Sequence, residues 1–283
     1  MTTFLGMGLL GSNFVRAMRK RGEDVHVWNR TASKAKALEA TGAKAFATPA
    51  EAVTGANRIH LVLSDDEAVN SVLEQASPGF AKDVIIIDHT TTSATGAAER
   101  TERWKKLGVT YIHAPVFMGP ANALDGSGTM LISGDQELIK KIEPELSKMT
   151  GTLMNLGDDI STAAAYKLLG NHLFLSITAG LADTFTLGKA LGVSRDDVTD
   201  FIEQMGSTPM KTRVARMLLG NYDTPSWELV MARKDARLMT EEAERAGMAL
   251  DVMPAFGAHM DRLITEGFGA KDWSIVTKEA VSK

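Results

Sequence analysis

Up to about residue 150, short apolar runs alternate with amphipathic stretches. The apolar runs are rich in β-branched residues and end at polar or turn residues, which predicts strands at Thr2–Leu5, 24–30, 58–64, 83–90, 109–116 and 129–135. The amphipathic stretches predict helices, among them Leu9–Lys20, 31–40, 67–75 and Ala94–Lys106. Strands that are apolar along nearly their whole length are typical of a mostly parallel sheet with helices on both faces. We therefore predict a doubly wound α/β domain.

After about Gly151 the pattern changes, and we find no convincing strand from there to residue 283. Helical periodicity dominates and predicts helices at 161–191, 194–205, 228–246 and 252–266. At the ordinary rise per residue the first of these exceeds about 40 Å. The predicted organisation is an α/β domain over 1–158 and an all-α domain over 159–283, entered by a long interdomain helix.

Three glycines near the N-terminus have the spacing of a dinucleotide-binding turn. Gly6, Gly8 and Gly11 lie between the first predicted strand and the first predicted helix. They suit, in order, a tight turn, close approach of the backbone to a pyrophosphate, and close packing of helix on strand. The helix N-terminus offers N–H groups to the phosphates. This context predicts a Rossmann domain that contacts its cofactor through Gly6, Met7, Gly8, Leu9, Leu10 and Gly11.

The end of the second strand bears on the choice of cofactor. NAD binders usually carry Asp or Glu there, whereas this chain has Asn29, Arg30 and Thr31. Arg30 can pair with a ribose 2′-phosphate and Thr31 can donate a hydrogen bond to it. The alternative is that Arg30 is a solvated residue at a helix start. We expect NADP(H) to be favoured over NAD(H).

Composition narrows the class of partner. The 283 residues carry a net charge of −4 and no Cys. Mild acidity argues against nucleic acid as the main partner, although it leaves a small anionic substrate open. The absence of Cys, and of a basic region before the apolar residues of "MTTFLGMGLLGS", favours a cytoplasmic protein without a signal peptide. The histidines lack metal-ligand spacing, so no metal site is expected.

The segment 160–182 has a single formal charge, Lys167. It is long enough to test as a membrane span, but its Lys, Asn and His residues disfavour that reading. We expect no membrane partner, and a helix buried between domains or subunits instead.

Five ordered stretches, "GMGLLGSNF", "DHTTTSATG", "HAPVFMGPANALDGSGTML", "YKLLGN" and "RKDARL", give the chain a family resemblance. It resembles the β-hydroxyacid dehydrogenases, which include 3-hydroxyisobutyrate dehydrogenases and semialdehyde reductases. The resemblance implies a Rossmann domain followed by a helical domain, and a homodimer or homotetramer. It also implies a small-molecule carbonyl or hydroxyacid substrate.

Residue by residue, the resemblance makes Lys167 the catalytic lysine and Asn171 its partner one turn later. It places Thr91 beside nicotinamide and substrate, and Lys234 on the cofactor from the helical domain. Leu63 and Ser64, at the end of the predicted strand 58–64, join the expected cofactor contacts.

The expected substrate loop departs from the family. Phe117, Met118 and Gly119 stand where relatives commonly have Ser-Gly-Gly, so only backbone N–H groups could bind an oxyanion there. His113 replaces the usual Asp, and Asn122 adds a possible donor. The loop favours a substrate with an apolar portion over a small hydroxylated acid.

The two helical residues explain the expected chemistry. Lys167 and Asn171 lie at i and i+4, so they share one helix face. Hydride transfer to a carbonyl carbon builds negative charge on the oxygen, which an ammonium can stabilise and then protonate. The alternative is that Lys167 snorkels to solvent or pairs with Asp183 or Asp235. His172 is turned away from this face, and His89 is at most a pocket residue.

The leading hypothesis is an NADP(H)-dependent oxidoreductase that interconverts a small aldehyde or keto acid and the hydroxyacid. Two alternatives remain open: an imine reductase on the same fold, and a non-catalytic dinucleotide-binding protein.

Overall fold

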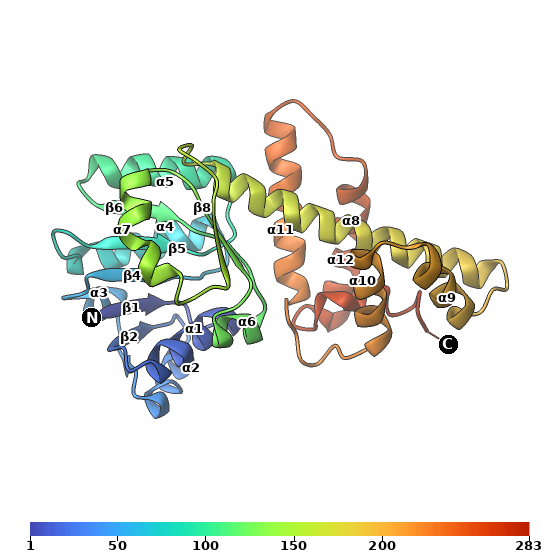
Figure 1. The fold of residues 1–283 in the computed structure, drawn as a ribbon, viewed down its shortest axis with the longest axis horizontal. Helices are drawn as coiled ribbons and strands as arrows, with labels where there is room; N and C mark the ends of the chain where they lie inside the picture. Colours follow the sequence, from blue (N-terminus) through green and yellow to red (C-terminus); the bar gives the residue numbers. More distant parts are fainter. Residues whose placement is uncertain (283) are drawn as a thin grey trace. The chain divides into compact units, whose positions relative to one another are not determined.

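A computed structural model describes residues 1–282, except for the side chain at position 209. Residue 283, the last of the predicted helical domain, lies outside this range. The chain divides into two compact units, the first over Met1–Leu168 and the second from Leu169 onward. The first is a Rossmann-type α/β unit and the second is largely helical (Figure 1).

The strands are, in chain order, β1 (Thr2–Leu5), β2 (Val25–Trp28), β3 (Lys44–Ala45), β4 (Arg58–Leu61), β5 (Ile85–Asp88), β6 (Thr110–His113), β7 (Val116–Phe117), β8 (Thr129–Ile132) and β9 (Thr152–Asn155). Six of them form a parallel sheet of order β3-β2-β1-β4-β5-β6. The order reverses direction between β1 and β4, which is where α/β sheets of this kind bind dinucleotides. The predicted doubly wound sheet is confirmed.

The helices of the first unit are α1 (Leu9–Lys20), α2 (Ala32–Lys36), α3 (Pro49–Val53), α4 (Asp66–Ala76), α5 (Ala94–Lys106), α6 (Pro120–Asp125) and α7 (Gln136–Leu146). Helices cover both faces of the sheet, and because successive strand side chains point to opposite faces, both sets are largely buried. Phe4 packs with α1 on one face while Leu5 packs with α3 and α4 on the other. In β5, Ile85 and Ile87 join the first cluster and Ile86 the second.

A second, small sheet corrects two sequence predictions. Its order is β7-β8-β9, with β7 antiparallel and β9 parallel to β8. The predicted strand 109–116 is split between the two sheets, since Ala114 and Pro115 intervene between β6 and β7. The expectation of no strand after Gly151 is wrong at β9, whose residues are mostly exposed and therefore show no apolar pattern.

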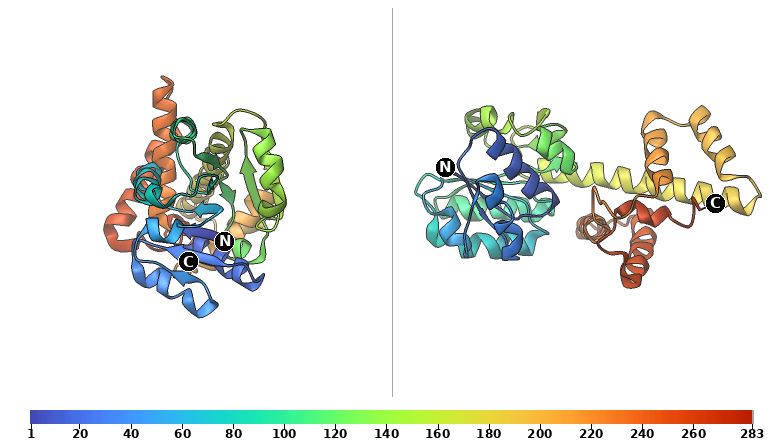
Figure 2. Two further views of the ribbon diagram at one scale, coloured as in Figure 1. Left: turned by 90° about the vertical axis from the view of Figure 1, so that its left-hand side faces the viewer. Right: turned by 90° about the horizontal axis from the view of Figure 1, so that it is seen from below.

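The second unit contains most of α8 (Thr162–Ala190), followed by α9 (Arg195–Met205), α10 (Thr208–Leu219), α11 (Leu229–Arg245) and α12 (Val252–Leu263). Figure 2 shows α8 as one continuous yellow helix, as the sequence predicted. Helix α10 was not predicted, and the predicted helix 252–266 ends early in a π-helical turn where Gly267 has φ +93°. The predicted helix 31–40 is reduced to α2 and a 3-10 turn at Glu39–Thr41.

Candidate active site

The glycine turn has the shape that a pyrophosphate needs. A Cβ on Gly6, which has φ +100°, would lie 2.1 Å from the Val62 carbonyl oxygen, and a Cβ on Gly11 would lie 1.9 Å from the Gly6 carbonyl oxygen. In contrast, a Cβ on Gly8 would meet nothing within 4 Å. Gly8 is the N-cap of α1 and offers no side-chain cap to its N–H groups. The backbone is tightly packed at Gly6 and Gly11, whereas the space at Gly8, at the N-terminus of α1, is open. These residues therefore fit a dinucleotide phosphate.

The end of β2 is tied to this turn by Asn29. Its Oδ1 accepts from the Met7 N–H at 2.9 Å and its Nδ2 donates to the Thr31 carbonyl at 2.9 Å. The amide therefore supports the backbone of two predicted cofactor contacts. Arg30 and Thr31 are exposed at the start of α2, where a ribose substituent of a bound dinucleotide would be expected.

The ends of β4 and β5 are joined through Thr90. The Leu63 N–H donates to Thr90 Oγ1 at 3.0 Å, and the Thr90 N–H donates to Asp88 Oδ1 at 2.9 Å. Ser64 is exposed and Thr91 half-buried beside this connection. Three of the predicted cofactor residues thus lie on two adjacent strand ends of one sheet, the edge at which such sites form.

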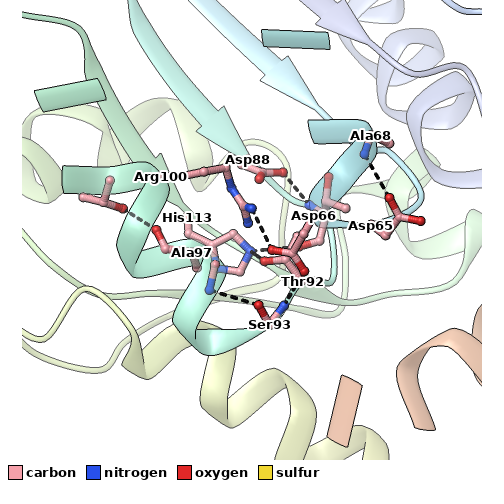
Figure 3. A network of polar contacts seen from close by, with 12 residues as sticks. Asp65, Asp66, Ala68, Asp88, Thr92, Ser93, Ala97, Arg100 and His113 are labelled. Atoms are coloured by element: carbon pink, nitrogen blue, oxygen red, sulfur yellow. Dashed lines mark hydrogen bonds and ion pairs between the residues drawn. The ribbon is translucent and has the colours of Figure 1, made fainter. Parts of the chain in front are cut away.

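A largely buried polar network lies around Asp88, at the end of β5 (Figure 3). Tyr111 donates to Asp88 Oδ2 at 2.6 Å and accepts from Arg100 Nε at 3.1 Å. Arg100 also pairs with Asp66 Oδ1 at 2.6 Å, and Asp66 Oδ2 accepts from the Ser93 N–H at 2.9 Å. Asp88 and Asp66 thus accept from the backbone N–H groups of Thr90 and Ser93, which lie on either side of Thr91 in the "DHTT" segment.

Its neighbours keep Arg100 protonated although the guanidinium is buried. Burial acts to lower the pKa of Arg100, but Tyr111 and the two carboxylates outweigh it and raise that pKa. Burial and the neighbouring Asp88 raise the pKa of Tyr111, so the phenol stays a donor. The sequence analysis did not identify these residues as part of the site. Asp65 is the N-cap of α4, and Asp66, the first residue of that helix, also pairs with Arg100.

Three histidines are core residues. His89 donates from Nδ1 to the Ala114 carbonyl at 2.7 Å, and its Nε2 lies 3.0 Å from His60 Nδ1. Because a carbonyl only accepts, His89 Nε2 is the acceptor and His60 the donor in this pair. Burial lowers the pKa of His89 to about 4 and that of His60 well below its usual value. His113 contacts the Thr90 carbonyl at 2.8 Å, and burial lowers its pKa too.

Lys167 lies on the second turn of α8 and is 8% exposed. Its Nζ is 4.2 Å from the centroid of the Phe117 ring. The structure therefore brings together two residues that the sequence placed in the catalytic and the substrate-binding sets. Met118 is half-buried next to Phe117.

The backbone after Phe117 is less available than expected. The Gly119 N–H donates to Asn122 Oδ1 at 2.9 Å, and Asn122 Nδ2 donates to Ser127 Oγ at 2.9 Å. This capping arrangement at the start of α6 engages both the Gly119 donor and the Asn122 amide within the loop.

In the helical unit, Asn171 is 4% exposed and donates to Asp235 Oδ2 at 2.5 Å. Lys234, the predicted cofactor lysine, forms an ion pair with the same Asp235 carboxylate. Asp235 is thus the residue that orients two members of the predicted site. The sequence considered it only as a possible partner of Lys167.

No group of three or more His, Asp or Glu side chains within residues 1–282 is arranged to hold a metal ion. None of the described helices combines the length and apolar character that a membrane crossing requires.

Comparison with known proteins identifies the family. Residues 2–157 match the NAD binding domain of 6-phosphogluconate dehydrogenase, and residues 159–281 match the C-terminal domain of NADPH-dependent reductive aminase-like proteins. The chain is 27% identical to the chloroplastic glyoxylate/succinic semialdehyde reductase 2 of Arabidopsis thaliana, over 96% of this chain and 77% of that protein.

Two solved structures share the fold. One is a 3-hydroxyisobutyrate dehydrogenase of Mycobacterium tuberculosis, with a TM-score of 0.86 and 20% identity over 99% of each chain. The other is an imine reductase of Myxococcus stipitatus in complex with NADP+, with a TM-score of 0.70 and 20% identity over 98% of this chain and 99% of that one. Since the first family model covers more than half of the chain, the protein belongs to the oxidoreductase family with the NAD binding domain of 6-phosphogluconate dehydrogenase, and the matches to a semialdehyde reductase and to the fold of a 3-hydroxyisobutyrate dehydrogenase bear out its resemblance to the β-hydroxyacid dehydrogenases.

Proposed function

We propose that the protein is an NADP(H)-dependent reductase of a small aldehyde or keto acid, reversible as a hydroxyacid dehydrogenase, with Lys167 as general acid and base. The observation that carries the proposal is the buried ammonium of Lys167 on α8, next to Phe117 of the expected substrate loop. Burying a lysine is unfavourable unless the environment or the chemistry uses its charge.

The proposed roles follow from what each side chain can donate. When bound, the reduced nicotinamide supplies a hydride to the carbonyl carbon of the substrate. Lys167 donates a hydrogen bond to the carbonyl oxygen, stabilises the charge that develops there, and transfers one proton to it. The neutral amine left behind recovers its proton from solvent. In the oxidative direction the amine takes the hydroxyl proton.

Asn171 is proposed to orient this exchange. The hydrogen bond from Nδ2 to Asp235 fixes the amide, and an amide oxygen is the acceptor proposed to orient the Lys167 ammonium or the substrate hydroxyl. Lys234 is proposed to contact the cofactor, with Asp235 holding both residues. The glycine turn, Leu63, Ser64 and Thr91 are proposed to bind the dinucleotide.

The test of Lys167 is substitution by Ala. We expect kcat for carbonyl reduction to fall by at least about 10²-fold, the lower end for a positioned acid–base group, with little change in NADPH affinity. Lys167→Arg serves as the matched variant, because it keeps a cation but does not release a proton near neutral pH. Unchanged turnover in Lys167→Ala would remove the lysine from the mechanism and favour a non-catalytic dinucleotide-binding protein.

We propose that Arg30 and Thr31 give the protein its preference for NADP(H), since both are exposed where the adenosine ribose of the dinucleotide is expected. Arg30→Asp should shift the ratio of kcat/KM values from NADPH toward NADH, because a carboxylate repels the 2′-phosphate and accepts from a 2′-hydroxyl. Equal loss with both cofactors would contradict this assignment.

Imine reduction is the second candidate. It is favoured by the match of residues 159–281 to reductive aminase-like C-terminal domains and by the apolar side chains of Phe117 and Met118. Steady-state rates with succinic semialdehyde and with a cyclic imine separate the two candidates. Turnover of the imine alone would overturn the leading proposal.

A homodimer or homotetramer in the cytoplasm is proposed as the working form. The helical unit exposes large apolar side chains, which an oligomer would cover: Leu169, Leu173, Phe174, Leu187, Leu191, Phe201 and Met205. Sedimentation measurements of the purified protein test the oligomeric state.

A further inference from the structure

The Lys167–Phe117 contact is built on a common frame. Phe117 pairs with Thr129 across the antiparallel strands β7 and β8. The first turn of α8 is attached to the end of the same strand β8, since the Ala163 N–H donates to Ser133 Oγ at 2.9 Å. The backbone of Phe117 and the first turn of α8 are therefore both attached to β8 or to the residue that follows it.

The distance is suited to a cation–π interaction. Lys167 Nζ lies 4.2 Å from the Phe117 ring centroid, well inside the roughly 6 Å limit for such contacts. Among such lysine–phenylalanine contacts in the described residues, this one is shorter than Lys44 over Phe46, at 5.1 Å, and Lys278 over Phe268, at 5.0 Å. Lys167 is also buried whereas Lys44 is exposed, so less water competes for its charge. A ring face attracts the ammonium and not the neutral amine.

A second set of polar and charged groups lies further along α8. One turn further along, Asn171 donates to Asp235, whose carboxylate is ion-paired with Lys234. Behind the substrate loop, Asp88 accepts from Tyr111 and Thr90, and His89 and His113 are bonded to backbone carbonyls. Phe117 is a partner in none of these hydrogen bonds and ion pairs.

We propose that Phe117 is a positioning residue for Lys167: its ring face holds the ammonium in place and favours the protonated form. The consequence for catalysis rests on the proposed function, because a lysine kept protonated is ready to act as an acid in carbonyl reduction. The residue that departs from the family's usual serine thereby acts on the lysine and not only on the substrate.

The experiment is an NMR titration of the purified protein without cofactor, labelled with 13C at lysine Cε. The Lys167 signal is assigned with Lys167→Arg and followed from neutral to strongly alkaline pH. In Phe117→Leu, which keeps an apolar side chain but has no ring, the titration midpoint of Lys167 should fall by about one pH unit. In Phe117→Tyr, which keeps the ring face, it should stay at the wild-type value.

Lys44 provides the internal control, since its signal should not move in either variant. A Lys167 midpoint that changes by less than about 0.2 pH unit in Phe117→Leu would overturn the proposal. Matching denaturation midpoints for the three proteins exclude a folding defect.

The same variants separate this inference from the proposed function. If Lys167 is the acid, the alkaline limb of kcat/KM for carbonyl reduction should move with the NMR midpoint in Phe117→Leu. A midpoint that moves while the activity profile does not would leave the cation–π inference standing and contradict the catalytic role of Lys167. An unmoved midpoint together with an inactive Lys167→Ala variant would overturn the cation–π inference and leave the catalytic role of Lys167 standing.

Discussion

The buried histidines predict a specific loss of stability in mild acid. In the folded protein His89 is buried, and burial lowers its pKa to about 4, against 6.5 for an exposed imidazole. As the pH falls, His89 is therefore protonated near pH 6.5 in the unfolded chain but only near pH 4 in the folded protein. The stability due to the neutral ring is complete above pH 6.5 and is lost progressively as the pH falls toward 4.

The structural cause is the proton arrangement of the pair. Neutral His89 donates from Nδ1 to the Ala114 carbonyl and accepts on Nε2 from His60. A second proton on His89 would face the His60 N–H, so protonation breaks the hydrogen bond and places a charge beside the Phe4 and Phe14 rings. A shift from 6.5 to about 4 corresponds to roughly 3 kcal/mol over the whole range, and about 2 kcal/mol of it is lost between pH 7 and pH 5.

Urea denaturation at a series of pH values measures this loss. The free energy of unfolding of the wild type should fall by at least about 2 kcal/mol from pH 7 to pH 5, because the lowered pKa values of His60 and His113 act in the same direction. His89→Asn keeps a donor for the Ala114 carbonyl and removes the titration, so its stability should be lower at pH 7 but flatter over this window. An equal slope in wild type and His89→Asn would refute the reasoning.

Two further predictions concern the cofactor turn and the network behind it. Gly11→Ala should lower both the melting temperature and the NADPH affinity, because its Cβ would lie 1.9 Å from the Gly6 carbonyl oxygen. Gly8→Ala should keep the melting temperature and lower only the NADPH affinity, because its Cβ would meet nothing within 4 Å. Equal melting temperatures for the two variants would contradict the packing argument. Tyr111→Phe should lower the free energy of unfolding by about 2–4 kcal/mol in urea, because Asp88 Oδ2 and Arg100 Nε lose a buried partner, and a change below about 0.5 kcal/mol would show that the phenol is dispensable.

The sequence predicted the elements that carry their own periodic signal. The parallel strands were recognisable because both of their faces are apolar, and α1 and α8 because their patterns are long. Strand β9 was not predicted, because its residues are mostly exposed and only their pairing with β8 makes them a strand. The division of the predicted strand 109–116 between two sheets is likewise a matter of pairing partners, which local composition does not specify.

The candidate site shows the same division. The glycine spacing, the Arg30 position and the i, i+4 placement of Lys167 and Asn171 are local properties, so the sequence by itself determined them. Asp88, Arg100, Tyr111 and Asp235 gained their roles only in the folded chain, as did the Phe117 ring under the lysine. Their partners lie far away in the sequence and meet through strand order and helix packing. Contacts of that kind carry no period or spacing along the chain, and therefore only the tertiary structure decided them.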